Sequence, residues 1–448
     1  MRQIHLVSFD TELVIQKIRK YCGSSTLWVA YSGGMDSHVL LHFLATHREQ
    51  FPQKIQVVHV DHQLQSQSAH WAEHCRQVVA SLHIPFHCLK VTVTDINQSG
   101  LESAARTARY QAIDQLINDD GVLLTGQHLQ DQSETLMLQL LRGAGSRGLG
   151  AMKAISHWQK MQIVRPLLTI SRQALLEYAT THQLQWIEDP SNQNTLINRN
   201  FLRHHIWPLL QQRWPALNRN LERSANNLQE SQILLDEIAQ EDLNSVEANV
   251  IDGSLSITKL HMLSAPRQRN VLRFFIKQLN MVLPSRINLQ RILTEVCQAA
   301  VDGQPQVSWS QYIARRYQNT LYISRLRQHP LTVSSVNLIY DRQPILLDAE
   351  HQLVWKAARG EGIRAELFTS GLALTFRQGG EKIQLAGKSH HQSLKKLFQE
   401  WQIPVWQRDS IPLLFASQQL VAIVGYACAE TAKPLSDETG WLPVIEQT

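Results

Sequence analysis

Hydrophobic positions in the first half of the chain follow two alternating patterns. Short runs of apolar and β-branched residues predict buried strands, and longer segments with apolar residues three or four apart predict helices. Strands that alternate with helices of about 10–15 residues favour a doubly wound, mainly parallel sheet covered on both faces, the α/β class. The predicted strands are 27–30, 55–60, 86–93, 121–125 and 163–164, and the predicted helices are 37–47, 68–82, 101–117 and 131–141.

The pattern changes after about residue 221. Apolar residues at helical spacing then predict a helix-rich region, with helices over 271–279 and 287–300 and short strands over 307–323. From about residue 339, short strands mix with a helix near 393–401. For 448 residues, about three domains are expected. We predict a catalytic domain over 1–215, a helical middle domain over 216–335 and a small α+β C-terminal domain over 336–448.

Composition narrows the class of protein. Apolar residues make up 43% and charged residues 18%, which is typical of a globular chain. No apolar stretch is long enough for a membrane span, and the N-terminus lacks a secretory pattern. Five scattered cysteines without a C-x-x-C pair disfavour a disulfide framework, a zinc ribbon or an iron–sulfur cluster, so we expect a reducing cytoplasm. The net charge of +5 permits a nucleic-acid partner without requiring one.

Three segments resemble motifs of other chemistry. Residues 142–148 contain G-x-G-x-x-G, but the segment follows a helix and no acid stands at the distance that a dinucleotide site needs. Residues 387–389 resemble the end of a Walker A loop, but Lys382 stands where that loop has glycine. Residues 70–74 spell H-x-x-E-H without an evident third ligand, so a surface helix is favoured over a zinc site.

The informative motif is Ser-Gly-Gly-Met-Asp-Ser, which follows the first predicted strand and opens a helix. Glycines let the backbone approach an anion, and the free N–H groups at the helix start favour negative charge. Serine hydroxyls can donate to phosphate oxygens, whereas an acid beside phosphates indicates a bridging Mg²⁺. We therefore predict a phosphate site at Ser32, Gly33, Gly34, Met35, Asp36 and Ser37, with Asp36 as a metal ligand.

This spelling resembles the pyrophosphate loop of the N-type ATP pyrophosphatases. The resemblance implies ATP at the carboxyl ends of the strands, cleaved between its α and β phosphates. It also implies that the substrate is first adenylated and that a nucleophile then displaces AMP. One motif does not select a member of this superfamily.

Nine further segments are informative: 60–64, 102–110, 125–135, 165–168, 188–192, 199–200, 376–380, 394–400 and 403–409. In this order, they resemble the tRNA(Ile)-lysidine synthetase family, including the C-terminal tRNA-binding domain of its longer members. The resemblance covers nearly the whole chain. Where the family often has T-G-H-H, Gln127 replaces the first histidine, so we assign no protonation role there, and His128 is a weaker candidate.

The resemblance implies a ligase with two steps. Oxygen 2 of the wobble cytosine attacks the α-phosphate of ATP, and the ε-amine of free L-lysine then attacks carbon 2. The partners implied are tRNA(Ile) with a CAU anticodon, lysine, ATP and Mg²⁺, in the cytoplasm and without a membrane. Another tRNA base modification such as thiolation, a small-molecule amide synthetase and a non-catalytic RNA-binding protein remain alternatives, and a homodimer is left open.

Four charged residues complete the predicted catalytic set with Asp36. Asp131 and Glu134 share a helix face, so one could bind Mg²⁺ and the other the lysine amine, although acids also cap helix starts. Asp131 is also a candidate second Mg²⁺ ligand. Arg106, with Arg109 beside it, could steady phosphates or the adenylated cytosine, or could lie on a solvated basic face. Arg199 is placed in the same catalytic set.

Basic residues also predict the tRNA-binding surface. Residues 195–225 hold five arginines and one acid, which suggests a surface that faces phosphates. In the C-terminal region, basic residues interleave with Trp401 and Trp406, which suits RNA contact and stacking, although we expect at least one tryptophan in a core. The predicted tRNA-binding residues are Arg203, Arg377, Lys395, Lys396 and Arg408.

Overall fold

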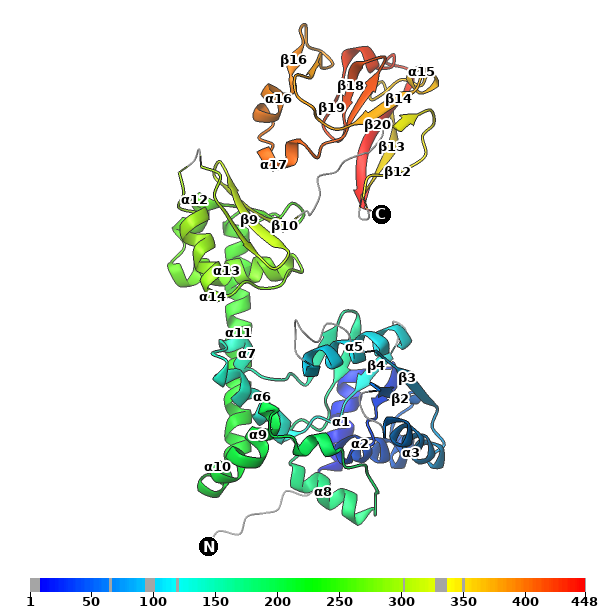
Figure 1. The fold of residues 1–448 in the computed structure, drawn as a ribbon, viewed down its shortest axis with the longest axis vertical. Coiled ribbons are helices and arrows are strands. Elements are labelled where there is room, and N and C mark those ends of the chain that lie inside the picture. Colours follow the sequence, from blue (N-terminus) through cyan, green and yellow to red (C-terminus); the bar gives the residue numbers. More distant parts are fainter. Residues whose placement is uncertain are drawn as a thin grey trace. The chain divides into compact units, whose positions relative to one another are not determined.

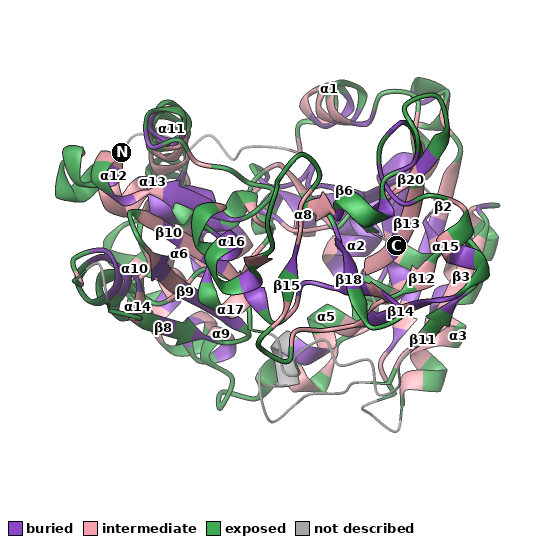
Figure 2. Cartoon of the chain, turned by 90° about the horizontal axis from the view of Figure 1, so that it is seen from above, coloured by how far each residue is buried: buried purple, intermediate pink, exposed green. Residues whose placement is uncertain are grey.

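The computed structural model describes residues 9–63, 67–92, 101–117, 121–300, 303–326, 337–348 and 351–447. Contacts divide the chain into two compact units, Met1–Leu235 and Asp236–Thr448. The division falls inside helix α11 (Leu217–Ser245), much of which is exposed and drawn green in Figure 2. The predicted boundary at 215/216 lies just before this helix, and the one at 335/336 lies outside the described residues. Both boundaries stay predictions.

The first unit is built on a six-stranded sheet in the order β3-β2-β1-β4-β6-β5. Figure 1 labels β2, β3 and β4 of this sheet, in the blue and cyan part of the chain. All neighbouring strands are parallel except β5 and β6, which form an antiparallel hairpin at one edge. The central strand β1 pairs with β2 on one side and β4 on the other, so the strand order reverses there. The strands are β1 (Thr26–Ala30), β2 (Ile55–Asp61), β3 (Phe86–Lys90), β4 (Gly121–Leu124), β5 (Ile155–Trp158) and β6 (Met161–Val164).

Helices cover both faces of this sheet. Val14, Val39, Cys75 and Leu175, from four helices, share one core with β1 residues such as Val29. On the other face, a fifth helix packs on a second core around Trp28 and Leu123. The predicted doubly wound fold is therefore confirmed. The helices are α1 (Thr11–Cys22), α2 (Met35–Thr46), α3 (Ser68–Ser81) and α8 (Arg172–Thr181) on the first face, α5 (Leu101–Leu116) on the second, and the short η1 (Arg48–Gln50).

A group of helices outside the sheet packs around α6. Leu202, Trp207 and Leu217 form a small core with apolar residues of α6. One turn of this group, η3, is a π-helix, a form that frequently occurs at functional sites. The elements are α6 (Leu129–Leu141), α7 (Ser146–Leu149), η2 (Pro190–Gln193), α9 (Asn198–Phe201), η3 (Leu202–Ile206) and α10 (Trp207–Arg213).

The second unit contains two separate hydrophobic cores. The first lies between helices and an antiparallel sheet in the order β7-β10-β9-β8. Its elements are β7 (Ser254–Ser256), α12 (Ile257–Met262), α13 (Ala265–Gln278), α14 (Arg286–Arg291), η4 (Ile292–Val296), β8 (Gln306–Trp309), β9 (Tyr312–Tyr317) and β10 (Thr320–Arg325). Helices in this region and strands over 307–323 were both expected from the sequence.

The second of these cores lies within the small antiparallel sheets near the C-terminus. The predicted helix near 393–401 is α16. The elements are β11 (Asn337–Ile339), β12 (Ile345–Leu346), β13 (His351–Arg359), α15 (Glu366–Thr369), β14 (Leu372–Thr375), β15 (Lys382–Ile383), β16 (Gln392–Ser393), α16 (Leu394–Glu400), α17 (Val405–Arg408), β17 (Leu413–Ala416), β18 (Gln419–Ile423), β19 (Ala427–Cys428), η5 (Glu430–Ala432) and β20 (Thr439–Gln447). No helix in the described part of the chain has both the length and the hydropathy needed to span a bilayer.

Candidate active site

The Ser-Gly-Gly turn joins β1 to α2 at the carboxyl edge of the sheet. Gly33 has a φ of 84°, a conformation that residues with a side chain rarely adopt. A Cβ atom at this position would lie 2.7 Å from Cδ1 of Ile187. The carbonyl of Gly33 accepts a hydrogen bond of 2.9 Å from the amide of Ile187. Ile187, in the segment that follows α8, therefore packs against the turn and hydrogen-bonds to it.

The start of α2 offers unpaired donors. Its N-cap residue is Gly34, which provides no side-chain cap. The Ser37 hydroxyl donates to the Gly34 carbonyl at 2.9 Å and lies 3.1 Å from the Ser32 hydroxyl, so both serines lie at the turn. Because amides at a helix start are free and the helix dipole favours anions there, this turn is suited to phosphate.

The loop between β4 and α6 packs directly against this helix start. A Cβ atom at Gly126 would lie 2.9 Å from the Asp36 carbonyl oxygen and 3.0 Å from the Ser37 nitrogen. Only glycine permits this approach, because both neighbours are backbone atoms. In the same loop, the Thr125 hydroxyl donates to the side-chain oxygen of Gln127, so that oxygen has a partner within the loop.

This contact gives a first prediction. A Gly126→Ala variant should form adenylate at least about tenfold more slowly, because the extra methyl group pushes the loop away from Asp36. Pyrophosphate release in a single turnover measures the effect. Gly145→Ala is the matched control, since a Cβ atom there meets nothing within 4 Å. Equal rates for the two variants would contradict the prediction.

His128 is buried at the start of α6 and joins the two predicted metal ligands. Its Nδ1 accepts a hydrogen bond of 3.1 Å from the Gln130 amide, which caps the helix. Its Nε2 lies 3.6 Å from Oδ2 of Asp36 and 3.5 Å from Oδ2 of Asp131. Burial works to lower the pKa of His128, but the charges of Asp131, Asp36 and Glu134 raise it overall.

The raised pKa of His128 makes the stability of the folded protein depend on pH. A histidine whose pKa is higher in the folded protein adds stability that is fully present below its unfolded pKa of about 6.5 and is lost as the pH rises through the folded value. The melting temperature of the protein should therefore exceed that of His128→Gln by more at about pH 6 than at about pH 9. A constant difference across this range in calorimetry would show that His128 does not carry the effect.

Glu134 lies at the centre of an ion-pair group and has no exposed side-chain surface. Arg203 binds it with two nitrogens, each 2.7 Å from a different carboxylate oxygen, and Arg199 Nε lies 3.3 Å from Oε2. Arg203 also reaches Oδ1 of Asp131 at 3.3 Å. Arg199 donates to the Thr135 hydroxyl at 2.7 Å. Both oxygens of Glu134 are therefore occupied by arginine.

A single segment, residues 187–204, joins the phosphate turn to these arginines. It begins at Ile187, which binds Gly33, and ends on the helix that carries Arg203. Between them, the buried amide of Asn200 donates to the carbonyls of Ser191 and Asn194 at 2.9 and 3.0 Å. The segment therefore fixes the turn and the arginines relative to one another.

Comparisons with known proteins agree with this arrangement. Three family models match, described as a PP-loop domain (residues 9–210), a TilS substrate binding domain (255–322) and a TilS substrate C-terminal domain (372–446). The chain is similar to the tRNA(Ile)-lysidine synthase of Coxiella burnetii, with 38% identity over 433 residues covering 97% of this chain and 96% of that protein. The corresponding proteins of Pectobacterium atrosepticum and Serratia proteamaculans show 40% identity (93% of each chain) and 39% identity (96% and 98%).

The chain belongs to the tRNA(Ile)-lysidine synthase family. The resemblance inferred from the sequence motifs is thereby confirmed, and the PP-loop domain places the chain among proteins that use ATP. Five of the residues predicted for catalysis or tRNA binding lie together in this family's PP-loop domain. They are Asp36, Asp131, Glu134, Arg199 and Arg203.

Arg106 does not join this group. It is exposed on α5, with its guanidinium 4.8 Å from the centre of the Tyr110 ring. Its neighbour Arg109 donates to Nε2 of His62 at 3.3 Å, which brings together two of the motifs that marked the family. The catalytic role predicted for Arg106 stays a prediction.

The predicted C-terminal tRNA-binding residues fall into different environments. Lys395 and Lys396 are exposed on α16, where Lys396 lies 3.7 Å from Glu400. Arg377 is partly exposed and lies 3.4 Å from Asp409. Arg408 instead lies in the interior and donates to the Ile403 carbonyl and the Tyr317 hydroxyl, each at 2.9 Å. Its guanidinium is therefore engaged within the protein, and the tRNA-binding role predicted for Arg408 stays a prediction.

The two tryptophans near these residues pack against protein. Trp401 is stacked on Tyr426, with ring centres 5.5 Å apart, and contacts the C-terminal core. Trp406 packs edge-on against Tyr317 and Tyr322. Core packing, expected for at least one of them, is confirmed for Trp401.

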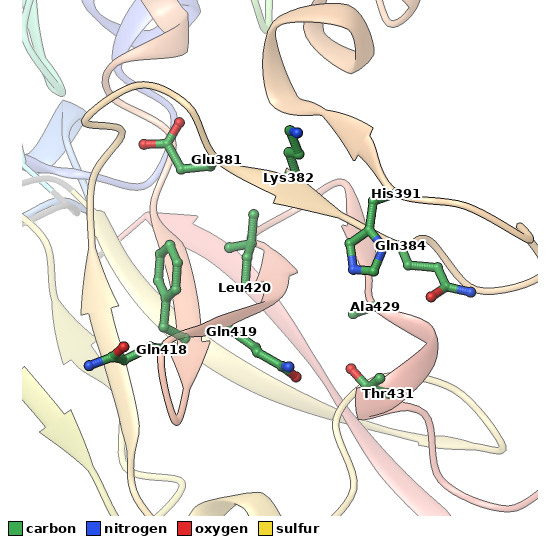
Figure 3. Close-up of a pocket in the computed structure, with 10 residues that line it drawn as sticks. Glu381, Lys382, Gln384, His391, Gln418, Gln419, Leu420, Ala429 and Thr431 are labelled. Carbon is green, nitrogen blue, oxygen red and sulfur yellow. The ribbon is translucent and has the colours of Figure 1, made fainter.

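A surface pocket of about 290 Å³ lies beside β15, β16 and β18 (Figure 3). Glu381 and Lys382 lie along one side, and Gln418, Gln419 and Thr431 lie opposite. Glu381 binds the amides of Gln378 and Gly379 at 2.5 and 2.7 Å, which shapes the Gly-Gly turn of the family motif. Acidic, basic, amide and apolar groups all line this pocket, which lies far in sequence from the PP-loop domain.

The sequence predicted only some of the residues that hold the candidate site in place. His128 was left as a weak candidate, Gly126 and Asn200 lay within family segments without an assigned role, and Ile187 was not singled out. Glycine two residues after β4 was a usable signal for the close contact with Asp36. Nothing in the sequence pattern indicated that Ile187 would bind the phosphate turn.

Proposed function

We propose that this protein ligates free L-lysine to carbon 2 of the wobble cytidine in the CAU anticodon of tRNA(Ile). Cytosine oxygen 2 attacks the α-phosphate of ATP, forming a P–O bond as pyrophosphate leaves. The lysine ε-amine, after losing a proton from its ammonium form, then forms a C–N bond to carbon 2 as AMP leaves with the C–O electron pair. The uncapped start of α2 beside two carboxylates carries this proposal, and the family relationship supports it.

The residues around the turn fit Mg²⁺. Oδ1 of Asp36 is buried and has no hydrogen-bond partner, which is unfavourable for a carboxylate oxygen unless a cation is present. The described residues contain no group of three or more His, Cys, Asp or Glu that could hold a metal. That suits Mg²⁺, which commonly binds one or two carboxylates together with substrate phosphates. Bound there, it would neutralise charge on the departing pyrophosphate.

Lysine needs a carboxylate for its ammonium group. Glu134 is saturated by two arginines, so we assign the ammonium to Asp131 and leave Mg²⁺ to Asp36 and the phosphates. In this proposal Glu134 holds Arg199 and Arg203 in place. The phosphates of ATP meet the free amides of α2 and the hydroxyls of Ser32 and Ser37.

The thiols argue against sulfur transfer, the nearest alternative. A catalytic cysteine reacts as a thiolate, which requires a lowered or ordinary pKa. Burial raises the pKa of all five cysteines, most strongly for the three that lie in cores. The pKa is raised to about 12 for Cys22, Cys75 and Cys297, to about 11 for Cys428, and in the same direction for Cys88.

The test is transfer of radiolabelled lysine into an isoleucine tRNA transcript with a CAU anticodon, with ATP and Mg²⁺ present. Methionine tRNA, which shares the anticodon, is the control. Label that depends on ATP and appears in isoleucine tRNA alone would support the proposal. Folded protein that transfers no label under these conditions would overturn it. A small-molecule amide synthetase would instead consume ATP without tRNA.

A further inference from the structure

One large apolar side chain in the 187–204 segment is exposed almost entirely to solvent. Leu196 is 92% exposed, in the loop between η2 and α9. The loop is nevertheless tightly bonded. The Leu196 amide donates to the Asn194 side chain at 3.1 Å, and the Asn194 carbonyl accepts from both the Ile197 amide, at 3.2 Å, and the buried side chain of Asn200, at 3.0 Å.

The loop that carries Leu196 belongs to the segment that joins the phosphate turn to the arginines. Three residues further along the chain stands Arg199, and seven residues further stands Arg203, and both reach Glu134. The same segment binds the phosphate turn through Ile187. Leu196 therefore lies on a hydrogen-bonded loop, three residues before Arg199 in the chain, within the segment that connects both halves of the candidate site.

The chemistry of the proposed function creates a need for such a group. The wobble cytosine must leave its stack before oxygen 2 can reach the α-phosphate, and unstacking a base costs a few kcal/mol. Proteins that unstack nucleic acids frequently insert an apolar side chain into the gap, and leucine is one of those used.

We propose that Leu196 enters the anticodon loop of the tRNA and occupies the space that the extruded cytosine leaves. The occupant of this apolar tip is thus a single-stranded RNA loop, because Arg213, Arg219 and Arg223, which follow in the same basic stretch of the chain, are exposed and suit its phosphates. This inference rests on the proposed function, and it assigns the extrusion of the base to a residue outside the catalytic group.

Exposure alone would not support this role, since single exposed apolar residues are common on protein surfaces. Ile251 is 98% exposed in a turn of the second unit, and its amide bonds to the Asn249 side chain in the same way. It differs from Leu196 in having no link to the arginines or the phosphate turn. Ile251→Ala is therefore the matched control.

The experiment compares the unaltered protein with Leu196→Ala, Leu196→Phe and Ile251→Ala. Adenylation is followed as pyrophosphate release in a single turnover with saturating tRNA and no lysine. We expect Leu196→Ala to be at least about tenfold slower, and Leu196→Phe to stay within about threefold of the unaltered protein. A transcript with 2-aminopurine in place of the adenosine after the wobble cytidine should brighten on binding the unaltered protein and much less on binding Leu196→Ala.

The outcomes separate this inference from the proposed function. If the unaltered protein makes lysidine while Leu196→Ala matches Ile251→Ala in both rate and fluorescence, the role of Leu196 is wrong. If Leu196→Ala weakens tRNA binding but keeps the full rate at saturation, Leu196 is only a docking contact, and the proposal is equally overturned. Failure of the unaltered protein to transfer lysine is instead a failure of the proposed function. Melting curves check that each variant is folded.

Discussion

An Asp36→Ala variant is expected to release pyrophosphate at least about a thousandfold more slowly than the unaltered protein. The carboxylate is the one acid at the start of α2, and its Oδ1 is buried without a partner, in the position we assign to Mg²⁺. Without it, the departing phosphates lose the cation that neutralises them. The measurement is single-turnover pyrophosphate release across a Mg²⁺ titration, and added Mg²⁺ should not restore the rate.

Asp437→Asn is the control, because this aspartate is exposed in the loop before β20. It should keep the full rate. If Asp36→Ala loses less than about tenfold, or recovers fully at high Mg²⁺, Asp36 is not the metal ligand that the chemistry needs. Unchanged binding of tRNA by Asp36→Ala would show that the loss lies in the chemical step.

Arg203→Ala is expected to lower the free energy of unfolding by roughly 3 kcal/mol, at the low end of the cost of breaking a buried ion pair, because Arg199 and the Gln130 side chain still contact Glu134. Glu134 has no exposed surface, and Arg203 supplies its two shortest contacts. Arg199 remains, at 3.3 Å. Glu134→Gln together with Arg203→Ala removes the buried charge as well, so the double variant should regain more than half of the lost stability.

Calorimetric melting of the full chain measures these differences. Arg76→Ala is the control, since its pair with Glu73 is 3.4 Å long and more than half exposed on both sides. Such surface pairs contribute little, so this variant should change stability by less than about 1 kcal/mol. If the double variant is no more stable than Arg203→Ala, the cost does not come from the unpaired carboxylate.

The fold of the first unit was largely predictable because strand and helix periods there are distinct. Each of the four longer predicted strands coincides with one of β1 to β4 to within a few residues, and the parallel order follows from the alternation with helices. Helix α1 and the edge strand β5 were not predicted. Strand β5 is a four-residue strand of which no residue is fully buried, so its sequence carries little period-2 signal.

The parts of the candidate site that lie within one short sequence motif could be predicted. The turn from Ser32 to Ser37 was located from its spelling and its strand–helix context. The acids on α6 followed from helical spacing. That Arg203 binds Glu134 could not be predicted, because that contact depends on how α9 and η3 pack against α6, 69 residues away in the chain. The same limit applies to Arg408, whose burial no local pattern revealed.

The uncapped start of α2 has a consequence for the thermal behaviour of the protein. A helix without a side-chain cap lacks stabilisation that a serine, threonine or aspartate would supply, and here a bound nucleotide is suited to supply it instead. Any ligand that binds only the folded chain adds stability that grows by about 1.4 kcal/mol for each tenfold rise in concentration above its dissociation constant. The heat tolerance of this protein should therefore track the ATP level of the cell, so that energy-starved cells hold a more fragile population of it.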